Sequence, residues 1–119
     1  MDKPISHERR KSRRQNISYY LPIMNSKTGE VFGHMVDISS GGFKIDSKVP
    51  VESNTDFTLH IDFMEMIADK AFFDFSARCI WCRPDPIQPY LFNVGLEFVN
   101  LSPEDMGVII SIAEKYGVN

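Results

Sequence analysis

The sequence predicts a mainly β domain of the barrel or sandwich type with one helix at its C-terminal end. Several short runs alternate apolar and polar residues, as strands with one buried face do, and turn-forming residues separate them. The last part of the chain instead spaces its apolar residues as a helix does. With 119 residues, 43% of them apolar, the chain has the size and hydrophobic content of a single domain with one core.

The first half of the chain is predicted to start with a hairpin. ISYYLPIM (17–24) is rich in β-branched and aromatic residues, and Pro22 suggests an edge position for this strand. The turn residues NSKTG lead into a second predicted strand, EVFGHMVDI (30–38). After SSGG, the alternation resumes in FKIDS. We therefore expect three short strands before residue 50.

Three longer runs in the second half are predicted to be strands with one buried face. These runs are TDFTLHIDF (55–63), FFDFSARCIW (72–81) and LFNVGLEF (91–98), the last two separated by a proline-rich loop. Apolar residues that are in phase within each run form the predicted buried faces: Phe57, Leu59, Ile61 and Phe63; Phe73, Phe75, Ala77, Cys79 and Trp81; Phe92, Val94, Leu96 and Phe98. For Trp81, the only tryptophan, core packing is the first interpretation, and stacking on a ligand base is the alternative.

A helix is predicted over about residues 102–116. Ser102 supplies a capping hydroxyl, Pro103 suits the first turn, and the two acidic residues that follow lie near the positive end of the helix dipole. Gly117 is the predicted stop. The predicted buried stripe consists of Met106, Ile109, Ile110 and Ala113. We expect this helix to pack on the barrel or to cover its mouth.

Positive charge is concentrated at the start of the chain. Residues 1–14 hold six Lys or Arg and two acidic residues, whereas the remainder holds seven basic and fourteen acidic ones. Most of the basic side chains lie in HERRKSRRQN (7–16). This segment has almost no apolar surface to bury, so we predict a flexible arginine-rich arm over 1–16 and a single domain over 17–119. A solvated tail without a specific role is the alternative.

Membrane insertion, secretion and catalysis are not expected. No run approaches the roughly 18 apolar residues of a membrane helix, and the start lacks the apolar centre of a secretory signal, so we expect a cytoplasmic protein. His7, His34 and His60 are scattered and are interpreted as surface residues rather than metal ligands. The sequence has neither a nucleophile elbow nor a phosphate-binding loop of the G-x-x-x-x-G-K-[ST] type, so we do not expect an enzyme.

Cys79 and Cys82 form a CxxC motif with strand-like flanks. Residues three apart on a regular strand point to opposite faces, so we expect neither a disulfide nor shared metal ligation unless the strand bends. No second CxxC or paired histidine completes a tetrahedral metal site. Both cysteines are therefore interpreted as structural.

The segment DISSGGF (37–43) is a candidate binding patch. Asp37 and Ser39 are two residues apart at a strand end and so point to the same side. Gly41 and Gly42 allow a close approach of the backbone. The alternative is an ordinary turn in which Asp37 and Ser39 bond to the local backbone.

The arginine segment and this patch together match a family pattern, RRxxxR followed by [DN]xSxxG. The chain thereby resembles a single PilZ domain, the bacterial receptor module for the second messenger cyclic di-GMP. The resemblance covers essentially the whole chain, including VGLEF (94–98) and the helix after it. It implies a six-stranded antiparallel β-barrel with a flexible basic N-terminal arm and a C-terminal α-helix. The matching positions are Arg9, Arg10 and Arg14, then Asp37, Ser39 and Gly42.

The resemblance implies that these six residues bind cyclic di-GMP. The backbone freedom of Gly41 and the stacking alternative for Trp81 make these two residues further candidates, and we expect no metal or cofactor. Arginine suits this ligand because its planar fork donates to phosphate or to guanine O6 and N7, and its face stacks on purines. Asp37 can accept from guanine or hold an arginine in place. Ser39 can donate to phosphate or base, and Gly42 lets the backbone come near.

We expect ligand binding to order the arm across the barrel and so to signal to a partner protein. The family implies an unidentified partner in motility, pilus, exopolysaccharide or virulence machinery. Two alternatives stay open: a PilZ-like interaction module that does not bind the nucleotide, and a basic arm that binds nucleic acid. The acidic body argues against DNA as a partner because it would repel a long polyanion.

Overall fold

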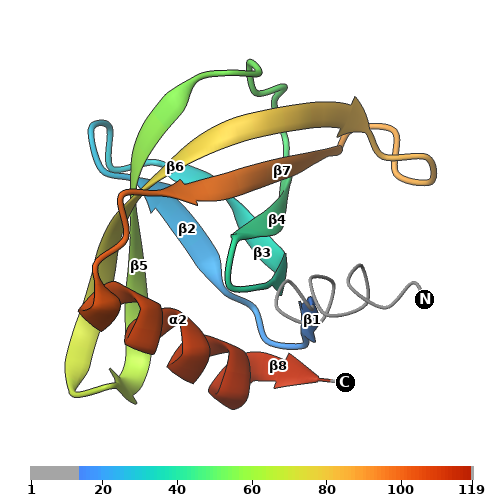
Figure 1. The fold of residues 1–119 in the computed structure, drawn as a ribbon. Helices are drawn as coiled ribbons and strands as arrows, with labels where there is room; N and C mark the ends of the chain where they lie inside the picture. The colour runs from blue at the N-terminus through green and yellow to red at the C-terminus, as the bar shows by residue number, and fades with distance from the viewer. Residues whose placement is uncertain (1–13, 119) are drawn as a thin grey trace, which may run out of the picture.

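The computed structural model describes residues 14–118, and every structural statement below concerns that part of the chain. Six antiparallel strands form a closed barrel in the order β2-β5-β6-β7-β4-β3, with β3 pairing back to β2 (Figure 1). The strands are β2 (Pro22–Asn25), β3 (Val31–Ile38), β4 (Gly42–Ser47), β5 (Asp56–Ile67), β6 (Lys70–Pro84) and β7 (Phe92–Val99). The predicted six-stranded antiparallel barrel is confirmed.

Two short strands extend the barrel sheet beyond β3. β1 (Gln15–Ile17) pairs with the end of β3, and β8 (Gly117–Val118) pairs with β1. The predicted strand 17–24 is therefore two strands, β1 and β2. The sheet begins at Gln15, two residues before the predicted start of the domain. Pro22 is the first residue of β2, and β2 pairs with both β3 and β5, so the suggested edge position is wrong. A proline is tolerated there because the first residue of a strand can lack an N–H donor.

The inward faces of the six strands form one core. Apart from Trp81, the in-phase residues predicted from the sequence belong to this core or pack against it, with Leu59, Ala77, Cys79 and Val94 fully enclosed. Phe43, from the predicted strand FKIDS, meets Phe75 edge-on at 5.6 Å between ring centroids. Burial of these side chains supplies the main driving force for closing the barrel.

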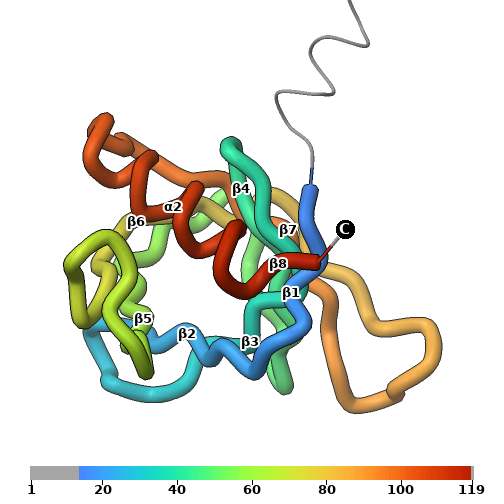
Figure 2. Tube along the Cα trace, turned by 90° about the horizontal axis from the view of Figure 1, so that it is seen from below, coloured from blue at the N-terminus to red at the C-terminus, as the bar shows by residue number. Residues whose placement is uncertain are grey.

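The helix α2 (Pro103–Tyr116) lies across the lower opening of the barrel (Figure 2). Ser102 and Asp105 cap it reciprocally, because each side chain accepts from the other residue's backbone N–H. The helix ends before Gly117, as predicted. No helix in residues 14–118 is long and apolar enough to cross a membrane.

The buried stripe of α2 differs from the predicted one. Ile110 is half exposed, and the buried residues are Val108, Ile109, Ile112 and Tyr116. The helix carries apolar residues on both candidate stripes, so periodicity alone could not choose between them. The stripe that faces the barrel is the one that includes Tyr116, whose ring stacks on the ring of Tyr19.

A β-bulge in β6 overturns the prediction that the two cysteines point to opposite faces. The register with β7 shifts between Cys79 and Trp81, and Cys79 and Cys82 then both pair with inward-facing residues. Their sulfurs contact both backbone polar groups of Val51: Cys79 Sγ donates to the Val51 carbonyl at 3.9 Å, and the Val51 N–H donates to Cys82 Sγ at 3.4 Å. Both thiols are free, and burial raises the pKa of Cys79. They fasten the β4–β5 connection to the barrel.

Candidate functional site

The strand register aligns the second motif with residues of three other strands on the outer face of the barrel. Asp37 pairs with Lys44 across β3 and β4, Lys44 pairs with Gly95 of β7, and Gly95 pairs with Trp81 of β6. Cross-strand neighbours lie within about 5.5 Å of one another, so these positions form one row. Gly95 and Trp81 of this row line the candidate pocket, and Asp37 and Lys44 continue the row beside it.

Asp37 joins the two motifs directly. Arg14 Nη1 donates to Asp37 Oδ1 at 2.7 Å, and Lys44 Nζ lies 3.8 Å from Asp37 Oδ2. The carboxylate is almost fully buried, whereas the Arg14 side chain is half exposed. A buried carboxylate needs such charge-assisted partners because burial without them is strongly unfavourable. Of the two roles expected for Asp37, the structure contains the second, an arginine held in place.

The turn between β3 and β4 is closed by Ser39. The Ser39 N–H donates to the Gly42 carbonyl at 2.8 Å, and Ser39 Oγ donates to the same oxygen at 3.3 Å. The ordinary-turn interpretation therefore holds for Ser39 but not for Asp37. A Cβ at Gly42 would collide with the Leu96 carbonyl of β7, while one at Gly41 would meet nothing within 4 Å. Close packing against β7 therefore explains why position 42 is a glycine. Contact between Gly42 and the ligand stays a prediction.

A pocket of about 300 Å³ opens beside this turn. It brings residues of both motifs together with residues of β6 and β7: Arg14, Ser39, Gly41, Gly42, Trp81 and Glu97 are among its lining. This volume is at the lower end of the range for small-molecule pockets. A cyclic dinucleotide bound here would therefore extend beyond the pocket. Arg9 and Arg10 lie outside the described residues.

Trp81 is on the outer face, so its predicted core packing is wrong. The bulge after Cys79 reverses the alternation of β6 and turns Trp81 outward, opposite Gly95. A Cβ at Gly95 would collide with the indole, so the glycine makes room for the ring. The Arg83 guanidinium carbon lies 4.7 Å from the indole centroid, within cation–π range.

Sequence reasoning missed Lys44, Arg83 and Glu97 as parts of this face. Lys44 and Glu97 lie at outward positions of their strands, which alternation alone could have indicated. Arg83 lies after the bulge that reverses the alternation of β6 and beyond the predicted strand 72–81, so alternation could not have placed it on this face. The nearness of all three residues to the motifs depends on the register between strands that are distant in sequence.

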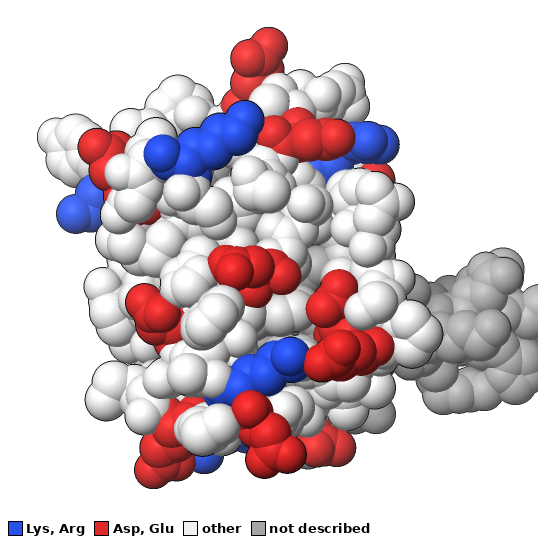
Figure 3. All heavy atoms as spheres, turned by 90° about the vertical axis from the view of Figure 1, so that its left-hand side faces the viewer, with Lys and Arg blue, Asp and Glu red and all other residues white. Residues whose placement is uncertain are grey.

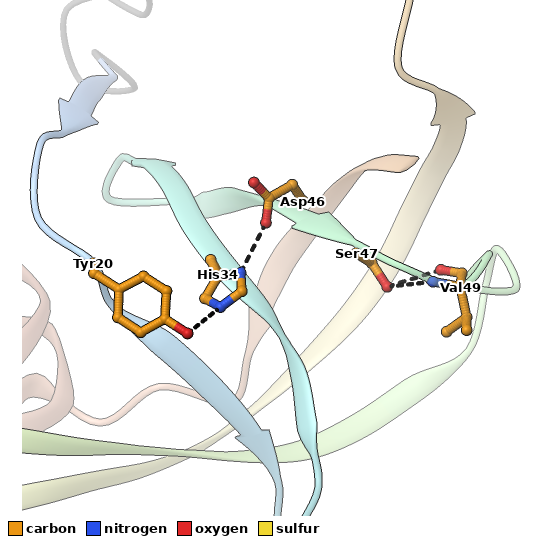
Figure 4. Close-up of polar contacts among 5 residues, drawn as sticks. All are labelled: Tyr20, His34, Asp46, Ser47 and Val49. Atoms are coloured by element: carbon orange, nitrogen blue, oxygen red, sulfur yellow. Dashed lines mark hydrogen bonds and ion pairs between the residues drawn. The ribbon is translucent and has the colours of Figure 1, made fainter. Parts of the chain in front are cut away.

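Figure 4 shows a second polar group, formed by Tyr20, His34 and Asp46. Tyr20 Oη lies 2.8 Å from His34 Nε2, and His34 Nδ1 lies 3.2 Å from Asp46 Oδ1. Asp46 is the next outward residue of β4 after Lys44. His34 is a partly exposed surface residue, as expected, but it is held by two side chains. Among the described residues, no three His, Cys, Asp or Glu side chains are grouped as a metal site would require.

The closed barrel, its terminal helix and the polar pocket on its outer face define a small β-barrel domain with one candidate ligand site. The family model described as the PilZ domain matches residues 8–115, and the chain belongs to this family. The resemblance drawn from the two motifs is confirmed.

Solved PilZ structures share the fold at low sequence identity. The PilZ domain of YcgR from Escherichia coli with c-di-GMP is 16% identical, with a TM-score of 0.63 over 90% of this chain and 93% of that one. The Bacillus subtilis inhibitor of motility, MotI or DgrA, is 15% identical, with a TM-score of 0.65 over 87% of this chain and 50% of that one.

Borreliella burgdorferi PlzA in complex with c-di-GMP is 12% identical, with a TM-score of 0.53 over 100% of this chain and 52% of that one. The match therefore spans about half the length of MotI and of PlzA. No curated protein sequence matches the chain.

Proposed function

We propose that this protein is a cyclic di-GMP receptor that binds its ligand between the N-terminal arginines and the outer-face pocket. The observation that carries the proposal is the meeting of the two motifs: Arg14 lines the same pocket as Ser39 and Gly42 and is bonded to Asp37, 23 residues away in sequence. Membership of the PilZ family supports the same ligand class.

The chemistry of the pocket suits a ligand with two phosphodiesters and two guanines. Arg14 uses one terminal nitrogen for Asp37, so its other N–H groups are available to phosphate or guanine oxygens. Asp37 fixes the position of that guanidinium before ligand arrives, which reduces the entropy lost on binding. Ser39 and Gly41 also line the pocket, and the space beside Gly41 is open.

Arg9 and Arg10 are within reach of the same pocket in this proposal. Arg14 is four positions after Arg10, and an extended chain of that length spans up to about 14 Å. Pairing of β1 with β3 anchors the chain directly after Arg14. Ligand contacts by the two earlier arginines would then order the arm, at about 2–5 kcal/mol of the gross interaction energy. The ordered arm presents a changed surface to a partner protein.

Titration calorimetry with cyclic di-GMP, run beside GTP and a DNA duplex, tests the receptor. We expect saturable heat with cyclic di-GMP alone. No heat with cyclic di-GMP at about tens of micromolar protein, where a receptor with a micromolar Kd saturates, would contradict the proposal and leave an interaction module that does not bind nucleotide.

Nucleic acid is a less suitable ligand than a dinucleotide. Figure 3 shows a face of the molecule on which acidic side chains outnumber basic ones. Residues 15–119 hold seven basic and fourteen acidic residues, so a long polyanion would be repelled beyond the arm. Duplex binding that falls steeply with salt is the result that would favour this alternative.

A further inference from the structure

Arg83 is placed next to the candidate pocket but belongs to neither motif. It lies on the outer side of β6, two residues after Trp81, and its guanidinium carbon is 4.7 Å from the centroid of the indole. Trp81 is one wall of the pocket. Gly95 leaves the space in which the indole lies, so the tryptophan has a defined position and Arg83 covers its ring.

Arg83 differs from the other arginines of residues 14–118 in having no carboxylate partner within ion-pair distance. Arg14 is bonded to Asp37 at 2.7 Å. Arg78 donates to both oxygens of Asp56, at 2.7 and 3.3 Å, and lies 3.9 Å from Glu97. The exposed Arg83 keeps its N–H donors available while the indole restrains its side chain.

A guanidinium held in this way is suited to a guanine base. Its planar fork matches the O6 and N7 acceptors of guanine, and its flat face accepts a stacked purine. A phosphodiester is less favoured at this position because Asp46 lies on the same cross-strand row as Arg83, with Asn93 between them. Guanine is uncharged and is not repelled by this carboxylate.

We propose that Arg83, stacked on Trp81, contacts a guanine of the bound ligand and contributes to the preference for guanine over adenine. This inference rests on the proposed function, since it concerns a ligand that also occupies the Arg14 pocket. The base then lies on the β6 side of the site, and the motif arginines hold the rest of the dinucleotide.

The test compares cyclic di-GMP and cyclic di-AMP binding to the parent, Arg83→Ala, Arg83→Lys and the matched control Arg78→Ala. We expect Arg83→Ala to bind cyclic di-GMP about ten-fold or more weakly, as the loss of a bidentate arginine–guanine contact implies, and to lose most of the guanine preference. Arg83→Lys should behave similarly because lysine keeps the charge but lacks the fork. Arg78→Ala should keep parental affinity.

Emission of Trp81, the only tryptophan, gives a second readout. Ligand should change this emission in the parent and less so in Arg83→Ala, whose melting temperature should stay parental because Arg83 is exposed. Parental affinity of Arg83→Ala, full rescue by lysine, an equal loss in Arg78→Ala, or an equal loss for both dinucleotides would each overturn the inference. A parent that binds no cyclic di-GMP would overturn the proposed function as well, so the two failures are distinguishable.

Discussion

Asp37 holds the first motif against the second. Its buried carboxylate accepts from Arg14 and lies near Lys44, so two cations compensate one buried charge. The spacing of the motifs in sequence indicated that these residues are functionally related. It could not indicate that they touch, because their contact depends on the pairing of β1 with β3.

Replacement of Asp37 by alanine should weaken cyclic di-GMP binding by at least about 1.5 kcal/mol, the value of a hydrogen bond to a charged group. Arg14 would lose its fixed position, while the half-exposed guanidinium would still be solvated, so the barrel should stay folded. Calorimetry measures the affinity, and thermal unfolding checks the fold.

Asp46→Ala is the matched control for this change. Asp46 is a carboxylate on the same outer face, but it contacts His34 instead of Arg14. We expect near-parental affinity for it. Equal binding by Asp37→Ala and the parent would show that the Arg14–Asp37 contact does not prepare the ligand site.

Among the elements, β6 shows most clearly where alternation predicts and where it fails. Phe73, Phe75, Ala77 and Cys79 face the core as their spacing predicts. One extra residue before Trp81 then reverses the phase, so the tryptophan moves from the predicted core to the candidate site. No local signal in RCIWCR marked the bulge, which appears only in the register with β7, where the indole lies over Gly95.

The β5–β6 pair carries a histidine whose charge should affect stability. His60 Nδ1 lies 2.6 Å from Asp74 Oδ1, and His60 Nε2 lies 2.7 Å from Asp62 Oδ1. Burial alone would lower the pKa of His60, but the hydrogen bonds and charges of the two aspartates outweigh it and raise the pKa above 6.5. The folded state therefore favours the imidazolium.

A raised folded-state pKa means that this stabilisation is fully present below about pH 6.5 and is lost as the pH rises through the folded-state value. The free energy of unfolding of the parent should therefore fall relative to that of His60→Gln over this range. Denaturant titrations between about pH 5 and about pH 9 measure the difference. A difference that does not change with pH would contradict the assignment.

For the molecule as a whole, the sequence predicted the six-stranded barrel better than the strand boundaries near its N-terminus and the buried face of the helix. Alternating runs and the two motifs were sufficient for a six-stranded barrel with a terminal helix, and both are present. The division of 17–24 into β1 and β2 was not predicted, because a run rich in strand formers does not show where pairing stops. The buried face of the helix was also misassigned, since the helix has two apolar faces and its packing on the barrel determines which one is buried.

Coupled binding and ordering predicts that amide exchange in residues 7–16 slows when cyclic di-GMP is added. Most of that segment lies outside the described residues, so the prediction rests on the proposed function. Exchange by mass spectrometry gives the measurement, with the β6–β7 loop, residues 85–91, as an internal comparison. Equal exchange of the arm with and without ligand would refute coupled ordering.

The pairing of β1 with β8 has a practical consequence for labelling. Asn16 lies opposite Val118, and the Ser18 N–H donates to the Tyr116 carbonyl at 3.1 Å, so residue 118 emerges beside the strand that follows Arg14 (Figure 2). A fluorophore attached there would lie close to Arg14 and would report changes around this residue when ligand binds. An acidic affinity tag joined at the same point would compete with ligand for Arg14 and should be removed before any titration.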